Sequence, residues 1–285
     1  MDFITLAEVT VDGLARGMLF AMLGAGITLV FGLGNVLNLA LGVFSVIAVI
    51  VAAQVTDAVP HVAIAVLIAI GAVGLLGLAI DRIILSSVYR STGEERILLG
   101  IFTTLGLAIF LDGLLFVYYP GNYSVSHGVS SISVGAVGIR GSTLLIIGSS
   151  FVILLALFVF LRLTFLGKVS RTVFQDETGA ILCGINPRRI RTLIFVLSIV
   201  IAGAAGVMWS LQSAVSPASA FELTIFAIIV SIVGGVRNIE GTIVAGLLLG
   251  FVITYANYFI GTYQAMIILF GVAVAVLILR PEEIA

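Results

Sequence analysis

Long apolar runs separated by short polar segments dominate the chain. A helix that crosses a bilayer needs about 20 mostly apolar residues, and nine runs approach or reach that length. These runs lie at residues 14–34, 39–57, 61–81, 97–118, 142–163, 190–212, 222–236, 241–260 and 263–280. Every proline lies between or after the runs, where its missing backbone N–H costs no helical hydrogen bond. The pattern predicts a single all-α polytopic membrane domain over residues 1–285, with about eight or nine transmembrane or half-membrane helices.

Two segments rich in glycine and asparagine interrupt the apolar pattern. The first break covers residues 32–42 (GLGNVLNLALG), and the second break covers residues 234–241 (GGVRNIEG). Their likeness predicts a weak parallel repeat of about residues 14–81 and 222–280, and paired broken helices are typical of a transport pathway. A tight hairpin at the membrane face is the alternative interpretation of each break. The pathway candidates in these breaks are Asn35, Asn38, Leu41 and Asn238.

The composition excludes several functional classes. Hydrophobic residues make up 61% of the chain and charged residues only 9%, whereas a soluble domain carries about 25% charged residues. A net charge of −1 gives no support to nucleic-acid binding, and the single cysteine excludes an internal disulfide. His61 and His127 lie far apart near expected loops, and no zinc-binding spacing occurs. We therefore expect neither a metal site nor a cofactor in this chain.

Basic residues set the expected topology, because cytoplasmic loops of membrane proteins carry an excess of Lys and Arg. Placing residues 81–96 and 164–189 in the cytoplasm leaves eleven of the thirteen basic residues inside. Only Arg16 and Arg140 then lie outside. The expected protein spans the cell membrane of a prokaryote several times, with its N-terminus outside and its C-terminus inside.

One polar island, Phe165–Arg191, lies within the apolar chain and defines an expected cytoplasmic coupling region at residues 164–190. Asp176 and Glu177 give a short helix an acidic first turn, which favours the helix dipole, and Gly184 ends that helix. A loop of this length with internal helix signals is usually functional. We expect a soluble partner to bind it, and a connecting loop without a partner is the alternative. The residues assigned to this contact are Asp176, Glu177, Ala180, Leu182, Gly184, Ile185 and Asn186.

The sequence argues against an enzyme. The phosphate-binding pattern GxxxxGK[ST] is absent, because Gly167-Lys168 lacks both the upstream glycine and the following Ser or Thr. If ATP drives this protein, another chain must hydrolyse it. Intramembrane proteolysis would need paired aspartates, a Ser/His pair or a zinc motif within the spans, and Asp112 is the one internal carboxylate. We expect no catalytic residue here.

Two polar features lie outside the island. The external loop, residues 119–141, alternates near Val125–Val137 and allows a short hairpin. Asp112 lies in the run 97–118, where a carboxylate costs about 3 kcal/mol and usually faces a cavity or a partner. It lines the pathway, binds a proton, or makes a helix–helix hydrogen bond. Interfacial solvation suffices for the charged residues at span ends, which are Glu222, Arg237 and Glu240.

Several stretches resemble the membrane permeases of branched-chain amino acid ABC importers, a family that also serves urea, short amides, and sugars or nucleosides. Residues 180–186 (AILCGIN) are similar to the end of the family's coupling helix, and residues 26–42 resemble its first motif. The other similar positions are Phe195, Ala202–Gly206, Val233–Gly241, Gly246, Gly250 and Leu279–Pro281. The departures are Leu39 and Leu41 for the family's Phe and His, Arg237-Asn238 for Gly-Ser, and Asp112 for a frequent amide. These departures lie where the pathway is expected, so the sequence leaves the identity of the solute open.

The resemblance implies a permease subunit in lipid, paired with a paralogous permease or with a second copy. It also implies two cytoplasmic ATPases, which bind ATP and Mg²⁺, and an external solute-binding protein that does most of the recognition. A branched-chain or hydrophobic amino acid is the first expectation for the solute, and urea or a short amide is the next. Two other classes stay open: a secondary transporter in which Asp112 carries a proton, and a passive channel in which the breaks form a filter.

Overall fold

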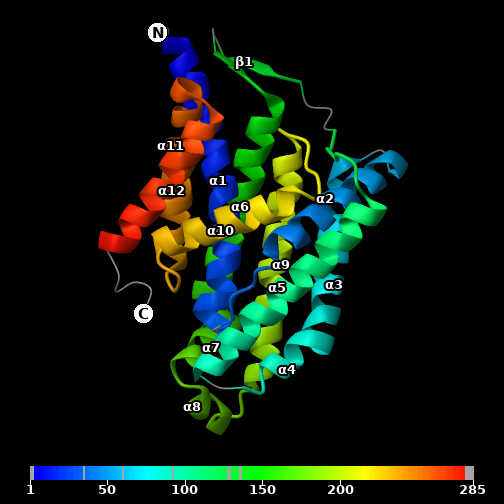
Figure 1. Ribbon diagram of the computed structural model, residues 1–285, viewed down its shortest axis with the longest axis vertical. Helices are drawn as coiled ribbons and strands as arrows, with labels where there is room; N and C mark the ends of the chain where they lie inside the picture. Colours follow the sequence, from blue (N-terminus) through cyan, green and yellow to red (C-terminus); the bar gives the residue numbers. More distant parts are fainter. Residues whose placement is uncertain are drawn as a thin grey trace.

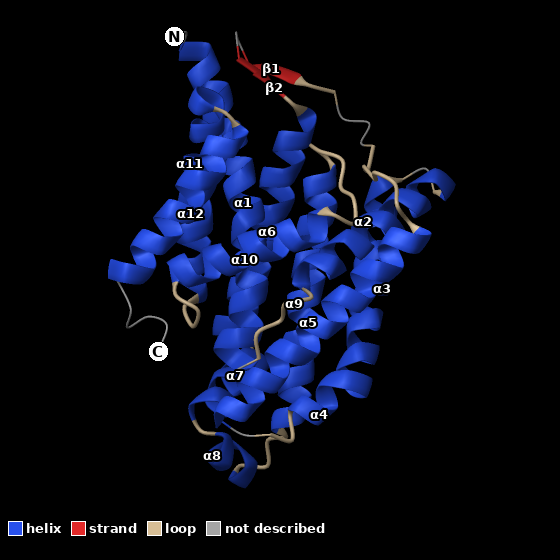
Figure 2. Cartoon of the chain, in the orientation of Figure 1, coloured by secondary structure: helices blue, strands red, loops and turns tan. Residues whose placement is uncertain are grey.

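The computed structural model describes residues 3–34, 36–59, 61–91, 93–126, 130–134 and 137–279. In these ranges the chain is a bundle of helices with a short hairpin at one end (Figures 1 and 2). Eight helices are long and apolar enough to cross a membrane. They are α1 (Phe3–Gly34), α2 (Leu41–Ala58), α3 (Val62–Ile80), α5 (Gly93–Tyr118), α6 (Gly141–Leu163), α9 (Pro187–Ser210), α11 (Ile239–Ile260) and α12 (Thr262–Leu279). The shorter helical elements are η1 (Asp81–Leu85), α4 (Ser86–Val88), α7 (Phe165–Gln175), α8 (Glu177–Leu182) and α10 (Ser219–Gly234).

The apolar runs predict these helices well, and two of them, the first and the third, are longer than expected. Helix α1 begins at Phe3, not at residue 14, so its 32 residues extend about 48 Å, well beyond a bilayer core of about 30 Å. Helix α10 has 16 residues, about 24 Å, and is the half-membrane element among the predicted runs. The third run continues past residue 81 through the π-helical turn η1 into α4.

Small residues let the central helices approach each other closely. Helix α1 packs along α11, and it also contacts α9 and α10. A Cβ on Gly17 would lie 2.9 Å from the Leu247 backbone, and a Cβ on Gly246 would lie 2.5 Å from the Ala21 backbone. Close contacts of this kind replace the hydrophobic effect as the force between helices in lipid. The glycine-rich seam between α1 and α11 is therefore the axis of the bundle.

Hydroxyl groups join the buried helices where they cross. The Thr28 hydroxyl lies 2.7 Å from that of Ser231 and 2.9 Å from that of Thr242, which connects α1 with α10 and α11. Ser198 of α9 donates to the Gly26 carbonyl at 2.7 Å, and Ser45 of α2 donates to the Ala202 carbonyl at 2.8 Å. These side chains are buried, so their hydrogen bonds fix the angle and height at which the helices meet.

The long loop after α5 carries the hairpin that the sequence allows, a few residues further along than expected. Strands β1 (Ile132–Val134) and β2 (Val137–Ile139) pair antiparallel. The Gly138 N–H donates to the Glu8 carboxylate at 2.9 Å, which holds the hairpin against the start of α1. The hairpin and the N-terminus thus lie at one end of the bundle, and α4, α7 and α8 lie at the other (Figure 1). His127 and Arg280 lie outside the described residues.

Candidate functional site

The predicted short helix in the polar island is present, and both of its ends are capped locally. Helix α8 begins after Asp176, whose Oδ1 accepts from the Gly179 N–H at 2.9 Å. At the other end Gly184 has φ +78°, a left-handed conformation that favours glycine. The Gly184 N–H donates to the Ile181 carbonyl and the Ile185 N–H to the Ala180 carbonyl, both at 2.9 Å. This pair of bonds is the Schellman arrangement, which satisfies the last helical carbonyls.

Glu177, the first residue of α8, is the centre of a charged latch that we define as Glu177, Arg96 and Arg191. Its Oε2 accepts from Arg191 Nη2 at 2.6 Å and from Arg96 Nη1 at 3.4 Å. The two arginine side chains are only 5% and 8% exposed, whereas Glu177 is 37% exposed. Breaking such a pair by removing one partner leaves a buried charge uncompensated. The latch therefore fixes α8 to the start of α5 and to the second turn of α9.

The latch also sets the protonation of Glu177. Burial alone would raise the pKa of this carboxyl, but the hydrogen bond from Arg191 and the charges of Arg191 and Arg96 outweigh burial, so the pKa of Glu177 lies below its ordinary value. Glu177 is consequently ionised at neutral pH, and its charge holds the two guanidinium groups in place.

A second layer of polar contacts supports the latch. The Arg191 guanidinium lies 5.7 Å from the centre of the Tyr89 ring, within the range of a cation–π contact. The Tyr89 hydroxyl donates to Asp81 Oδ1 at 3.1 Å, and the Thr192 hydroxyl donates to Asp81 Oδ2 at 2.6 Å. This chain of contacts connects the polar end of the α3–η1–α4 helix to the second turn of α9.

Helix α8 presents an apolar surface to the outside of the bundle. Leu182 is 84% exposed, and Ile181 beside it is also exposed. Ala180 is fully buried in the same apolar cluster that Ile185 contacts, so one side of α8 is anchored while the other is free. Asn186 ends the segment as the cap of α9, and its Oδ1 accepts from the Arg188 N–H at 3.1 Å. An exposed apolar tip on a rigidly held helix is suited to docking.

Helix α7, which precedes α8, is a feature that the sequence analysis did not predict. Its cap is Thr164, whose hydroxyl accepts from the Gly167 N–H at 3.1 Å. Its buried side includes Val169 and Val173, one helical turn apart. Gly167 lies so close to the backbone of Phe160 and Leu161 that a methyl group would overlap it. The signal that could have revealed α7 is the i, i+4 spacing of Val169 and Val173, which begins five residues after the capping Thr164.

Two of the three pathway candidates in the first break, Asn38 and Leu41, are buried in the bundle, and the third, Asn35, lies outside the described residues. The Asn38 side chain is fully buried, its Oδ1 accepts from the Ala40 N–H at 3.1 Å, and its Nδ2 has no partner among the described residues. Leu41, at the start of α2, is fully buried as well. Asn38 is thus a buried polar group with unused donors, and Leu41 is a core residue.

The two remaining pathway candidates, Asp112 and Asn238, lie on other elements, α5 and the turn before α11. Asn238 caps α11 by accepting from the Gly241 N–H at 3.0 Å. Asp112 is half-buried on α5, and its Oδ1 has no hydrogen-bond partner among the described residues. The seven docking candidates therefore lie on and beside α8, whereas no hydrogen bond joins the pathway candidates that the structure describes.

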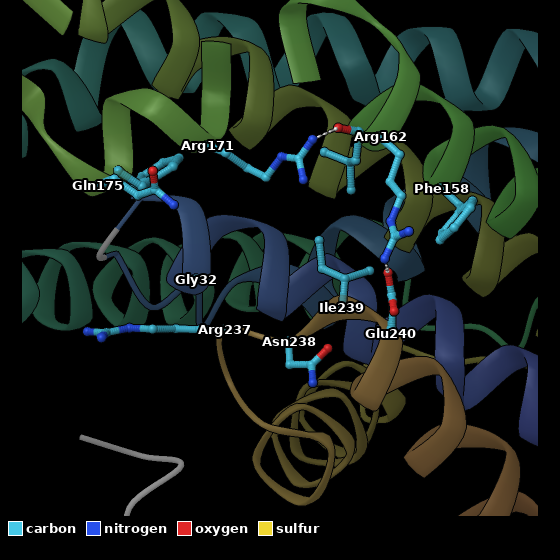
Figure 3. A pocket seen from close by; sticks show the side chains of 11 residues that line it. Gly32, Phe158, Arg162, Arg171, Gln175, Arg237, Asn238, Ile239 and Glu240 are labelled. Atoms are coloured by element: carbon cyan, nitrogen blue, oxygen red, sulfur yellow. Dashed lines mark hydrogen bonds and ion pairs between the residues drawn. The ribbon is translucent and has the colours of Figure 1, made fainter. Parts of the chain in front are cut away.

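A cleft of about 580 Å³ lies beside the second break and was not foreseen. Figure 3 shows Arg162 directed at Glu240 across it, with Arg171 and Gln175 above and Arg237 below. The Arg162–Glu240 pair spans 2.5 Å, and Arg171 donates to the Leu161 carbonyl at 3.1 Å. These residues come from α6, α7 and the α10–α11 turn, so no local pattern in the sequence announces them.

An apolar bundle with eight helices long enough to cross a membrane, a buried break between α1 and α2 and a locally capped short helix at one end has the architecture of a multi-pass membrane protein. The comparisons with known proteins agree with that class. The chain belongs to the family described as "Branched-chain amino acid transport system / permease component", whose profile matches residues 9–279. This confirms the family that the sequence resembles.

Several relatives match nearly end to end. The chain is 25% identical to the high-affinity branched-chain amino acid transport system permease protein LivH of Salmonella typhimurium, covering 99% of this chain and 96% of that one. It is 28% identical to the BraD permease protein of Pseudomonas aeruginosa, covering 96% and 94%. The solved structure described as PsaBC from Streptococcus pneumoniae in complex with Fab matches with a TM-score of 0.52 at 13% identity, covering 99% of this chain and 94% of that one. This last likeness concerns the fold alone.

Proposed function

We propose that this chain is one permease subunit of an ABC importer for a branched-chain or similarly hydrophobic amino acid. The family and the printed names of its relatives support the transported class, and urea or a short amide is the next candidate. The observation that carries the coupling role is α8, with its anchored charged first turn and its exposed apolar tip. The partners are a second permease, paralogous or identical, two cytoplasmic ATPases that bind ATP and Mg²⁺, and an external solute-binding protein.

The proposed orientation places α8 in the cytoplasm. Helix α7 and the starts of α5 and α9, which carry Lys168, Arg96 and Arg189, lie at the α8 end of the bundle (Figure 1). The hairpin, which Arg140 follows directly in the sequence, lies at the opposite end. The positive-inside rule then puts the N-terminus outside and the C-terminus inside the cell membrane of a prokaryote. The hairpin end would face the solute-binding protein.

The latch gives this proposal a mechanism. The exposed Leu182 and Ile181 would insert into a pocket of the ATPase, and closure of the ATPase dimer would shift α8. Because Glu177 ties α8 to Arg96 and Arg191, that shift would move the ends of α5 and α9 together. ATP then drives transport by favouring one of two arrangements of these helices.

The docking role is tested with Leu182→Ser in the assembled complex. Burying a leucine at an interface contributes about 1.5–3 kcal/mol, so the variant should retain the ATPase at least tenfold less tightly during purification, and uptake should fall. Tyr263→Ser is the matched control, because Tyr263 is also 84% exposed but lies in the first turn of α12 at the opposite end. Equal ATPase retention by wild type and Leu182→Ser, with normal uptake, would refute the proposal.

The latch is tested with Glu177→Gln, which removes its charge and keeps its shape. We expect ATP hydrolysis to continue while amino acid uptake falls, because α8 can move without α5 and α9. The control is Arg189→Gln, at an exposed position in the first turn of α9 and outside the latch. This variant should keep both ATP hydrolysis and uptake. The lowered pKa of Glu177 means that the latch stabilises the fold above the carboxyl's ordinary pKa and is lost as the pH falls through the lowered value. In Glu177→Gln, this loss of folding stability at low pH should no longer occur.

A proton-coupled secondary transporter is a second candidate, because Asp112 Oδ1 is buried without a partner among the described residues. In that case Asp112→Asn should abolish uptake, and an inactive ATPase should leave uptake intact. Our proposal requires the reverse: uptake against a gradient stops when the ATPase is inactive and continues with a protonophore present. Uptake that never exceeds equilibrium would instead indicate a passive channel.

A further inference from the structure

The cleft beside the second break carries more positive charge than its own contacts use. Its lining includes Arg162, Arg171 and Arg237 against a single carboxylate, Glu240, which leaves two positive charges. Glu240 pairs with Arg162, and Arg171 donates to a backbone carbonyl and pairs with no carboxylate among the described residues. Arg237 is exposed and forms no ion pair with any residue that the structure describes. An anion is therefore the natural complement of this basic cleft.

The same cleft has apolar walls. Phe158 and Leu161 of α6 and Phe174 of α7 contribute to its lining, and the Arg162 guanidinium lies 5.1 Å from the centre of the Phe158 ring. A small inorganic anion would contact the arginines but not these aromatic rings. A ligand with a charged head and a hydrocarbon body would use both.

The position of the cleft points to the edge of the membrane. Arg162 is one residue from the end of the apolar helix α6, and α7, which follows at once, buries one side and exposes polar residues on the other. The exposed Leu163 and Phe165 lie next to this corner. A basic residue at the end of a spanning helix and an amphipathic helix that follows it both belong at the level of lipid headgroups.

We infer that the basic cleft binds the phosphate headgroup of an anionic phospholipid from the leaflet next to α8, with part of its hydrocarbon against Phe158 and Phe174. Basic pockets between membrane helices on the cytoplasmic side bind such headgroups. The phosphate oxygens would accept from Arg171 and Arg237, which lie on opposite sides of the cleft in Figure 3. The lipid would thereby join α7 to the α10–α11 turn.

The test uses the full chain, stripped of lipid in detergent, with native mass spectrometry as the readout. Phosphatidylglycerol should bind at least tenfold more tightly than phosphatidylcholine. The double variant Arg171→Gln, Arg237→Gln should weaken phosphatidylglycerol binding about thirtyfold, at about 1 kcal/mol for each arginine and 1.4 kcal/mol per tenfold. Gln175→Lys adds a charge to the lining and should tighten binding.

The matched control is Arg188→Gln, Arg189→Gln, which removes two exposed arginines from the same end of the bundle but outside the cleft. It should bind phosphatidylglycerol like the wild type. If both double variants lose the same affinity for phosphatidylglycerol, binding depends on general surface charge and the proposal is overturned. Full displacement of the lipid by millimolar inorganic phosphate would assign the cleft to a free anion and overturn the lipid assignment. A thermal melt of each variant separates lost binding from lost folding.

Discussion

In the first break the backbone between α1 and α2 forms hydrogen bonds with side chains of other helices, whereas the hydrogen bonds of the second break are local. Thr104 of α5 accepts from the Leu39 N–H at 3.2 Å and lies 2.8 Å from the Leu37 carbonyl. Thr224 of α10 accepts from the Gly42 N–H at 3.0 Å. The first break therefore exists only when α5 and α10 are in place.

The second break takes its hydrogen bonds from its own residues. The Asn238 N–H donates to the Gly235 carbonyl at 2.9 Å, and the Asn238 side chain caps α11. Gly235 has φ +91°, which lets the chain reverse. Arg237 and Asn238 are exposed. Two segments with similar glycine and asparagine content thus have different physical causes: one is stabilised by tertiary contacts and the other by its own turn.

The largest expected effect is at Gly42, in the first break. A methyl group there would overlap the Ala220 carbonyl oxygen, so Gly42→Ala must push α2 away from α10. We expect a loss of at least about 3 kcal/mol, with little folded protein recovered from membranes. Gly34→Ala is the control within the same break, because its added methyl group would meet only Val30 Cγ1 at an ordinary 3.8 Å. Similar yields of the two variants by size-exclusion chromatography would contradict this account.

A smaller loss is expected when the first break keeps its shape but loses a hydrogen bond. Thr104 is fully buried, and Thr104→Val keeps its volume while leaving the Leu39 N–H without its partner. An unsatisfied buried donor costs about 1–3 kcal/mol, which should lower the melting temperature and slow uptake. Thr104→Ser restores the hydroxyl and should recover most of both. If Thr104→Val melts like the wild type, water or another group satisfies the break.

The contrast between the breaks explains how much the sequence can predict. Signals carried by neighbouring residues predict the structure correctly: the apolar runs, the short helix with an acidic first turn, its end at Gly184 and the positions of both breaks. These depend on contacts within a few residues. The family was likewise recognisable, because its motifs are local.

Contacts between distant residues could not be predicted in this way. Arg96 and Glu177 meet across 81 positions, and Thr104 reaches the first break across more than 60. The same limit applies to the basic cleft, whose arginines come from three separate segments. The weak repeat of residues 14–81 and 222–280 stays a prediction, and so do the pathway roles of Asn38 and Asp112.

The second break should respond to a backbone change that would be harmless elsewhere. Gly235→Ala places a Cβ on a residue with φ +91°, and we expect a cost of about 1–2 kcal/mol in thermal or denaturant melts. Gly113→Ala in α5 is the control, because nothing lies within 4 Å of its added methyl group. Alanine there should be neutral or stabilising by up to about 1 kcal/mol. Equal effects at the two positions would mean that the left-handed turn is not required.

The smallest effect separates the two interpretations of Asn238. If its role is to cap α11, Asn238→Ala should lower stability by about 1 kcal/mol, because the Gly241 N–H loses its acceptor. Asn238→Ser keeps a good capping oxygen and should restore both stability and uptake. If Asn238 lines the pathway instead, Asn238→Ser should melt like the wild type and still transport poorly, because the amide itself would be needed. Measuring melting temperature and uptake on the same two variants therefore decides whether the second break is a turn at the surface or part of the route that the solute takes.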